Sequence, residues 1–231
     1  MLPSSLAVLG QILDRRIESD EIINGISIDS RNIQKGDLFV ALRAKRDGHN
    51  FIDSAKTNGA VAALTTREHA ALPCLLVEDT GRAFTDLARA FRNDFLGQVF
   101  SITGSQGKTS TRGFLASVVR EVDQSDYQVD PLVTEKNLNN QLGVPLTLSK
   151  LRSYHRSIIL ELGASTVGDI DHLASIARPH ISCLLNARTA HLETFGSINR
   201  VIQGKGEIID HTDSNGFVIL NNDDPAFEQW Y

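Results

Sequence analysis

A glycine-rich stretch in the middle of the chain carries residue types that bind phosphate groups. It runs Gly104-Ser105-Gln106-Gly107-Lys108-Thr109-Ser110 and follows an apolar run over residues 99–102. Glycines let backbone amides close around phosphate oxygens, and the start of the following helix adds the positive end of its dipole. Lys108 adds positive charge, and the hydroxyl of Thr109 can ligate Mg²⁺. The stretch therefore predicts binding of a nucleoside triphosphate, and ATP is the one we expect.

This loop departs at one position from the commonest phosphate-loop pattern. That pattern has a glycine six residues before the lysine, where this chain has Ile102, so the loop is a shortened variant that begins at Gly104. The helix predicted to follow has an apolar side made of Phe114, Leu115, Val118 and Val119. A strand before the loop and a helix after it favour a phosphate site over a chance Gly-Lys-Thr.

Three further polar residues follow, or lie near, other predicted strands. Glu161 ends an apolar strand, where a carboxylate suits a hard cation that keeps substrate phosphates as ligands, although a helix cap or a surface charge is the alternative. His191 lies in the loop after the strand predicted at 181–185, where a structural histidine is the alternative. Lys205 lies on a helix predicted to start near Ser197, and its alternative is an ordinary solvated lysine.

The elements that must position these residues form a regular series. Apolar strands are predicted at 99–102, 157–162, 181–185 and 217–220, each followed by a helix. Continuously apolar strands fit a doubly wound parallel sheet that is covered on both faces. Ligands of such sheets bind beyond the carboxyl ends of the strands, so the glycine-rich loop and Glu161 should share one rim.

The first part of the chain predicts a separate, smaller α/β domain. Strands are expected at 26–29, 38–42, 60–64 and 74–77, with helices near the N-terminus, at 51–56 and around 84–91. The change of rhythm at Phe95-Leu96-Gly97 marks the boundary. We therefore expect an α/β fold with one domain over residues 1–96 and a P-loop-type parallel-sheet domain over residues 97–231.

Composition excludes several classes of function. The 231 residues carry a net charge of −5, with 41% hydrophobic and 22% charged residues, which is typical of a globular protein without a basic surface for nucleic acid. The N-terminus lacks a positive segment followed by an apolar core, and no apolar run approaches the roughly 20 residues of a membrane span. We expect a cytoplasmic protein with no nucleic-acid partner and no membrane span.

Taken together, the motifs resemble those of one family, the Mur ligases of peptidoglycan synthesis. Seven stretches match it in order across nearly the whole chain, and they are residues 29–42, 47–51, 103–109, 137–145, 161–164, 190–197 and 205–208. Two of them, Asn139-Asn140-Gln141-Leu142-Gly143-Val144-Pro145 and the stretch from Ala190 to Ser197, resemble the branch of the family that adds a dipeptide more than the branches that add single amino acids.

The resemblance implies an ATP-dependent ligase. ATP would phosphorylate the terminal carboxylate of UDP-MurNAc-tripeptide, and the amine of D-alanyl-D-alanine would attack the resulting acyl phosphate. It also implies roles for Lys108, with the loop amides, on the phosphates, for Thr109 and Glu161 on one Mg²⁺ and for His191 on a second metal ion. Lys205 matches a lysine that the family carries in carbamylated form, and Lys108, His191 and Lys205 would form the catalytic set.

The same resemblance places substrate contacts on two short stretches. Ser30 and Arg31 would contact the UDP portion, and for Arg31 a surface salt bridge is the alternative. Asn139 and Asn140 would lie at the junction between substrate and phosphate transfer, and for them an Asx turn capping the next helix is the alternative.

The length of the chain bears on what it would do. Members of the family have three domains, and the resemblance covers the first and part of the second, so we expect an incomplete ATP-binding domain, no domain for D-alanyl-D-alanine and no complete turnover by this chain alone. A non-catalytic UDP-sugar and nucleotide-binding module of the same fold is the main alternative. A generic P-loop kinase or GTPase is a third, which the short loop and the set of Glu161, His191 and Lys205 disfavour.

Overall fold

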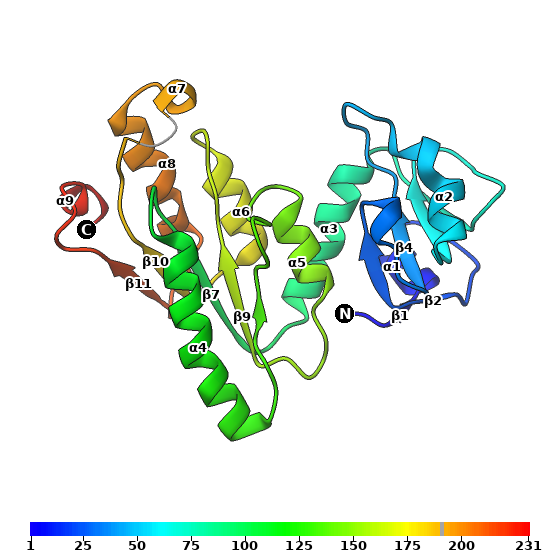
Figure 1. Ribbon diagram of the computed structural model, residues 1–231, viewed down its shortest axis with the longest axis horizontal. Helices are drawn as coiled ribbons and strands as arrows, with labels where there is room; N and C mark the ends of the chain where they lie inside the picture. The colour runs from blue at the N-terminus through cyan, green and yellow to red at the C-terminus, as the bar shows by residue number, and fades with distance from the viewer. Residues whose placement is uncertain (190–191) are drawn as a thin grey trace. The chain divides into compact units, whose positions relative to one another are not determined.

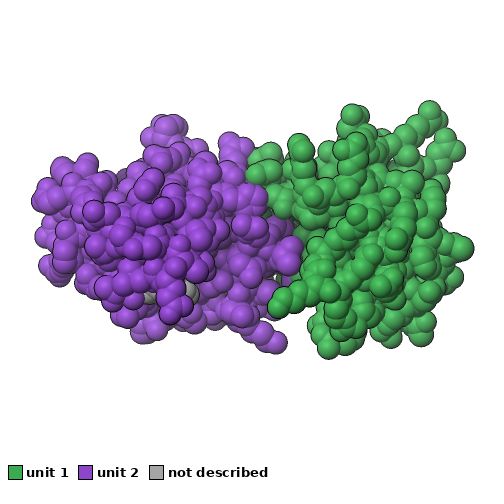
Figure 2. Space-filling view, turned by 90° about the horizontal axis from the view of Figure 1, so that it is seen from above, with its two compact units in different colours: residues 1–94, 148–153 green, residues 95–147, 154–231 purple. Residues whose placement is uncertain are grey.

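The computed structural model describes residues 1–189 and 192–231 (Figure 1). The chain divides into two compact units, which Figure 2 colours green and purple. The first unit comprises residues 1–94 and 148–153, and the second comprises residues 95–147 and 154–231. Because a compact unit is not the same thing as a functional domain, the boundary that we place after residue 96 stays a prediction.

The first unit is built on a parallel sheet of four short strands. Their order is β3 (Gly25–Ser27), β4 (Asp37–Val40), β5 (Ala62–Thr65) and β6 (Cys74–Leu76). A separate antiparallel pair joins β1 (Ser4–Ser5) to β2 (Ile22–Ile23). The helical segments are α1 (Leu6–Ile12), η1 (Ser30–Asn32), η2 (Gly48–Phe51), α2 (Ile52–Thr57) and α3 (Thr80–Asn93).

Local sequence explains why α3 forms where it does. The Asp79 side chain accepts hydrogen bonds from the amides of Gly81 and Arg82 and so caps the first turn. Buried Phe84, Leu87, Ala88 and Phe91 recur at the three- and four-residue spacing of one helix face. Elsewhere in the unit, Ile52 and Ala55 of α2 join a buried cluster with residues of β4 and β5.

The second unit contains a five-stranded, fully parallel sheet. Its order is β11 (Phe217–Leu220), β10 (Ile181–Leu184), β7 (Gln98–Thr103), β9 (Ser157–Glu161) and β8 (Leu132–Val133). The four strands that the sequence predicts are all present, and the α/β fold with parallel sheets is confirmed. The sequence gives no signal for β8, because a strand of two residues is too short for a periodic pattern.

The helices of the second unit lie on both faces of this sheet. They are α4 (Lys108–Tyr127), α5 (Gly143–Ser149, whose last two residues belong to the first unit), α6 (Asp169–Ala177), α7 (Leu192–Phe195), α8 (Ile198–Asp210) and α9 (Phe227–Trp230). From β7 the chain crosses towards the β8 edge of the sheet. From β9 it crosses in the opposite direction, to β10 and then to β11 at the other edge. Because such crossovers are right-handed, α4 lies on one face and α6 and α8 lie on the other (Figure 1).

The prediction that the sheet is covered on both faces is wrong at one edge. On β11, Phe217 is 68% exposed and Ile219 is 54% exposed, because the strand has one neighbour and α4 packs against β7 and β9 instead. The predicted apolar side of α4 is also partly wrong. The helix buries Ala116 and Val119, whereas Phe114 and Val118, which lie four residues apart on another side of the helix, are exposed.

No helix in the described ranges combines the length and the apolar character that crossing a membrane requires.

Candidate functional site

The glycine-rich loop lies where the sequence predicts it, between β7 and the first turn of α4. Strand β7 ends at Thr103, and α4 begins at Lys108. Gly107 precedes the helix with a φ of +81°, a left-handed backbone conformation that residues with a Cβ adopt only at an energetic cost. A Cβ on Gly104 would lie 3.0 Å from Cβ of Leu185, so this position also has little room for a larger residue.

Asn186, two residues after the end of β10, holds the loop from the side of the neighbouring strand. Its side-chain oxygen accepts hydrogen bonds from the amides of Ser105 at 3.1 Å and Gln106 at 3.0 Å, and its side-chain nitrogen donates to the carbonyl of Gln106. The hydroxyl of Ser105 in turn bonds the backbone of Arg188. Sequence reasoning missed Asn186, although its place after a predicted strand, on the rim where ligands collect, is a usable signal.

Lys108 folds back over the loop in this structure. Its ammonium group donates to the carbonyl of Gly104 at 2.6 Å and to the carbonyl of Ser105 at 3.4 Å. Burial lowers the pKa of Lys108, and the negative charge of Glu161 opposes that shift. Lys108 thus places a positive charge on the loop at the start of α4, where a bound polyphosphate would need it.

Glu161 ends β9 beside this loop, as predicted, and its side chain is buried. The hydroxyl of Thr109 donates to Oε2 at 3.1 Å, and the side-chain amide of Asn139 donates to Oε1 at 2.8 Å. A surface charge is therefore excluded for Glu161. The arrangement of Thr109 and Glu161 fits Mg²⁺, because adjacent ligands of an octahedral ion at 2.0–2.1 Å lie about 3.0 Å apart.

Within the part of the chain that the structure describes, no three His, Cys, Asp or Glu side chains cluster as a metal site would need. A magnesium site with one carboxylate and one hydroxyl from the protein does not require such a cluster, since Mg²⁺ takes its remaining ligands from phosphates and water.

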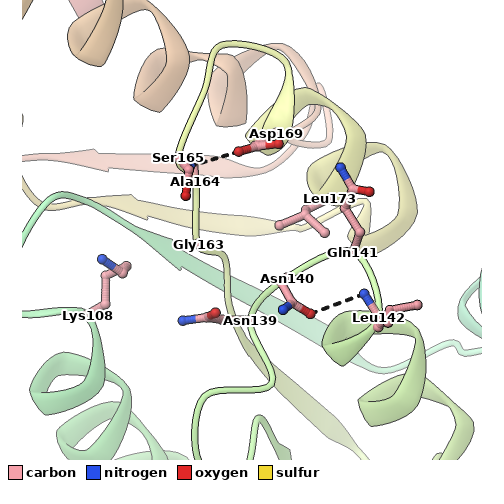
Figure 3. A pocket seen from close by; sticks show the side chains of 10 residues that line it. All are labelled: Lys108, Asn139, Asn140, Gln141, Leu142, Gly163, Ala164, Ser165, Asp169 and Leu173. Atoms are coloured by element: carbon pink, nitrogen blue, oxygen red, sulfur yellow. Dashed lines mark hydrogen bonds between the residues drawn. The ribbon is translucent and has the colours of Figure 1, made fainter. Parts of the chain in front are cut away.

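A cavity of about 540 Å³ opens beside Lys108 (Figure 3). The amide end of Asn139 points toward the side on which Lys108 lies. The side-chain oxygen of Asn140 accepts hydrogen bonds from the amides of Leu142 and Gly143, so the predicted alternative of an Asx turn capping α5 is present. The cavity is lined by Lys108, Asn139, Asn140, Gln141, Leu142, Gly163, Ala164, Ser165, Asp169 and Leu173.

Lys205 lies on α8 and is 2% exposed, so the alternative of a solvated lysine is wrong. Its ammonium group lies 3.4 Å from the carbonyl of Ala164 and 5.6 Å from the ring centre of Phe195. Burial, together with the positive charge of Lys108, lowers the pKa of Lys205 to about 8. Roughly a tenth of such lysines are neutral amines at pH 7, compared with well under a thousandth for an ordinary lysine.

The second predicted metal ligand cannot be compared with the structure, because His191 and its neighbour Ala190 lie outside the described residues.

The predicted contacts for UDP lie in the first unit, on η1. Ser30 is buried, and its carbonyl accepts a hydrogen bond from the Asn58 side chain at 2.8 Å. The guanidinium of Arg31 binds both oxygens of Asp29, at 2.9 Å and 2.6 Å, and its hydrogen bonds lower the pKa of Asp29 to about 2. The predicted alternative of a surface salt bridge is therefore present, and contact with substrate stays a prediction.

Comparison with known families assigns both parts of the chain. A model described as "Mur ligase middle domain" matches residues 102–231, which is more than half of the chain. The chain belongs to the Mur ligase family. A second model, described as "Mur ligase family, catalytic domain", matches residues 22–92. The family resemblance seen in the sequence is thus confirmed.

Curated Mur ligases show how much of such a protein this chain represents. It is 37% identical to the UDP-N-acetylmuramoyl-tripeptide--D-alanyl-D-alanine ligase of Escherichia coli, aligning over all of its own length and 50% of that protein. It is 32% identical to the Bacillus subtilis ligase of the same name, over 91% of this chain and 46% of that one. The chain therefore spans about half the length of the curated relatives it matches.

Solved Mur ligase structures agree with the fold. A crystal structure of MurF from Acinetobacter baumannii superposes with a TM-score of 0.88 at 33% identity, over 99% of this chain and 51% of that one. MurF ligase from Thermotoga maritima, solved in complex with ADP, gives a TM-score of 0.76 at 35% identity over 89% and 47% of the two chains.

Proposed function

We propose that this chain is part of an ATP-dependent ligase of peptidoglycan precursor synthesis. The substrates are ATP, UDP-MurNAc-tripeptide and D-alanyl-D-alanine, which the names of its curated relatives indicate. The observation that carries the proposal is the phosphate loop with Lys108 folded over it and Thr109 and Glu161 beside it. The similar MurF ligase of Thermotoga maritima was solved in complex with ADP, which supports nucleotide binding by this chain.

The reaction that we propose proceeds in two steps. The γ-phosphoryl group of ATP passes to the terminal carboxylate of UDP-MurNAc-tripeptide, which gives an acyl phosphate and ADP. The amine of D-alanyl-D-alanine attacks the acyl carbon, and the tetrahedral adduct collapses to a peptide bond with release of inorganic phosphate. Catalysis of this kind depends mainly on positioning and charge neutralisation.

Each residue near the loop has a proposed part in this chemistry. Lys108 and the amides of residues 104–110 bind the phosphates, and Thr109 and Glu161 hold a Mg²⁺ ion that neutralises phosphate charge when bound. Asn139 orients Glu161 through its 2.8 Å hydrogen bond, beside a cavity that Asn140 also lines. Ser30 and Arg31 contact the UDP portion, and His191 serves a second metal ion.

We further propose that Lys205 reacts with CO₂ to form a carbamate that helps to hold this second metal ion. Carbamylation needs a neutral amine, and a pKa of about 8 supplies one near neutral pH. With ¹³C-labelled bicarbonate, a carbamate signal should appear in the ¹³C spectrum of the parent and disappear in Lys205→Arg. A signal that persists in that variant, or never appears in the parent, would remove this role.

Lys108→Ala tests the nucleotide site. In calorimetric titrations with Mg·ADP, the variant should bind at least tenfold more weakly, and an exposed lysine of α2 changed in Lys56→Ala should leave the affinity unchanged. In the full-length protein, phosphate release that depends on both other substrates should fall by about 100-fold or more, as it does when one preorganised charge-stabilising group is removed. Release within a few-fold of the parent refutes the assignment.

A non-catalytic module of the same fold that binds the UDP-sugar substrate and a nucleotide is the second candidate. It predicts binding of UDP-MurNAc-tripeptide and ADP without phosphate release from the full-length protein. If mass spectrometry detects the ligation product after incubation of the full-length protein with its substrates, the non-catalytic candidate is excluded. The predicted cytoplasmic location stays a prediction.

A further inference from the structure

Arg112 is a charged residue near the phosphate loop that none of the motifs accounts for. It lies one turn after Lys108 on α4, and its side chain is 13% exposed. One guanidinium nitrogen, Nη1, lies 3.1 Å from Oε2 of Glu161 and donates to the carbonyl of Lys136 at 2.9 Å. Arg112 thus joins the helix after the loop, the end of β9 and the segment that leads to Asn139.

The partners of Glu161 explain what this arginine does. The carboxylate is 3% exposed, and an ionised carboxylate at that depth is costly unless a cation or strong donors accompany it. Asn139 and Thr109 supply neutral donors, and Arg112 supplies the positive charge. Lys108, a second cation near Glu161, donates its close hydrogen bond to the carbonyl of Gly104.

The position of the guanidinium is informative because Arg112 and Thr109 share one oxygen, Oε2. Thr109 and Glu161 are the pair to which we assign Mg²⁺, and a divalent cation between them would meet the positive charge of Arg112 within a few ångströms. Two cations cannot both pair closely with one buried carboxylate oxygen without strong repulsion. Metal binding is therefore favoured when the guanidinium withdraws from Oε2.

We propose that Arg112 is a displaceable internal counter-ion of Glu161. It holds the carboxylate in its ligating position before a metal ion arrives, and it opposes binding of a divalent cation on its own. A cation that arrives with a nucleotide brings negatively charged phosphates, which compensate the displaced guanidinium. The site consequently selects the metal–nucleotide complex over the free metal ion. This inference rests on the proposed assignment of Thr109 and Glu161 to Mg²⁺.

Binding of Mn²⁺, followed by electron paramagnetic resonance without nucleotide, tests the proposal. Arg112→Gln removes the charge while keeping a donor for Glu161 or the Lys136 carbonyl, and it should bind Mn²⁺ at least tenfold more tightly than the parent. Arg112→Lys keeps the charge and should bind weakly, as the parent does. The matched control is Arg120→Gln, an exposed arginine two turns later on α4 that pairs with Asp130, and it should leave the affinity unchanged.

Two outcomes overturn the proposal, and Glu161→Gln tells them apart. If Glu161→Gln abolishes Mn²⁺ binding in the presence of ADP but Arg112→Gln binds Mn²⁺ no more tightly than the parent, the counter-ion role fails and the metal assignment stands. If Glu161→Gln leaves Mn²⁺ binding with ADP unchanged, the metal assignment fails and takes the counter-ion role with it. Circular dichroism of each variant establishes that the fold is retained.

Discussion

The phosphate loop and the η1 turn are two segments for which we predict nucleotide contacts, ATP at the loop and the UDP portion at the turn, and they are held in different ways. The loop is fixed by Asn186 and by the backbone of Arg188, residues about 80 positions away in the sequence. The η1 turn is fixed mainly by Asp29, two residues from Arg31, and the Arg31 side chain is 83% exposed. The loop depends on residues that follow the neighbouring strand β10, whereas the η1 turn depends largely on residues close to it in the sequence.

This difference teaches where rigidity is needed. Transfer of a phosphoryl group to a carboxylate requires groups held within fractions of an ångström, and partly buried contacts with residues far away in the sequence can provide that. Recognition of the UDP portion, which we propose for the η1 turn, tolerates an exposed arginine that changes partners, because a guanidinium can exchange one hydrogen-bonding anion for another.

Asn186→Ala should have the largest effect of these variants, because it removes the long-range support of the loop. Losing the acceptor for two amides leaves the loop without its long-range support, and we expect ADP affinity to fall about 10- to 100-fold, as for two hydrogen bonds lost at a partly buried site. Calorimetric titration measures it. Asn199→Ala, at an exposed position on α8, is the control. Unchanged or tighter ADP binding would mean that Asn186 competes with phosphate rather than supporting the loop.

Gly107→Ala tests the backbone conformation of the same loop. Its Cβ would have ordinary space, 3.7 Å from Leu185, so the penalty comes from the left-handed φ and should lower the free energy of unfolding by about 1–2 kcal/mol. Gly113 lies inside α4, and a Cβ built there would have no atom within 4 Å. Gly113→Ala should therefore raise the free energy of unfolding by up to about 1 kcal/mol. Urea unfolding of both variants decides, and equal effects would contradict the explanation.

Arg31→Ala examines the locally held turn. Affinity for UDP-MurNAc-tripeptide should fall about tenfold, the value of one charge-assisted contact, with little loss of stability. Arg16→Ala removes a similarly exposed arginine that pairs with Glu18, and it should change nothing. If both variants bind the substrate as tightly as the parent does, Arg31 only pairs with Asp29 and does not contact the substrate.

Asp29→Asn should have the smallest effect, and its pH dependence is specific. The pKa of Asp29 is lowered from 3.8 to about 2 in the folded chain, so its contribution to stability is present above pH 3.8 and is lost as pH falls toward 2. We expect the variant to be less stable than the parent by under about 1 kcal/mol near pH 7, as for surface ion pairs. Denaturant unfolding should show this difference shrinking below pH 4, and a constant difference would contradict the cause.

The sequence predicts the parallel strands of the second unit well because their apolar runs are long and bounded by turns. It also predicts the phosphate loop, because Gly104, Gly107 and Lys108 lie within one short segment and their spacing is typical of phosphate binding. It does not predict the exposure of Phe217 or Phe114, because whether an apolar side chain is covered depends on which helix packs against which strand.

The contacts of the candidate site were harder to predict than its residues. Glu161 and Lys205 are identified by position and resemblance, but their burial and hydrogen bonds arise from segments far apart in the chain. Asn186 follows a predicted strand, which marks its place on the rim but not its bonds to the loop, and Arg112 contacts Glu161 from the next turn of α4. Such residues become visible when the sheet order is known.

The hold of Asn186 on the loop also has a consequence for how the protein folds. A contact between residues about 80 positions apart forms only after β10 lies beside β7, and the entropy of closing so long a segment makes such contacts late. We expect helix α4 to form early and the loop at its start to reach its binding shape late. In refolding experiments, binding of a fluorescent ADP analogue should therefore lag behind the recovery of helical circular dichroism, and simultaneous recovery would show that the loop takes its shape without the strand.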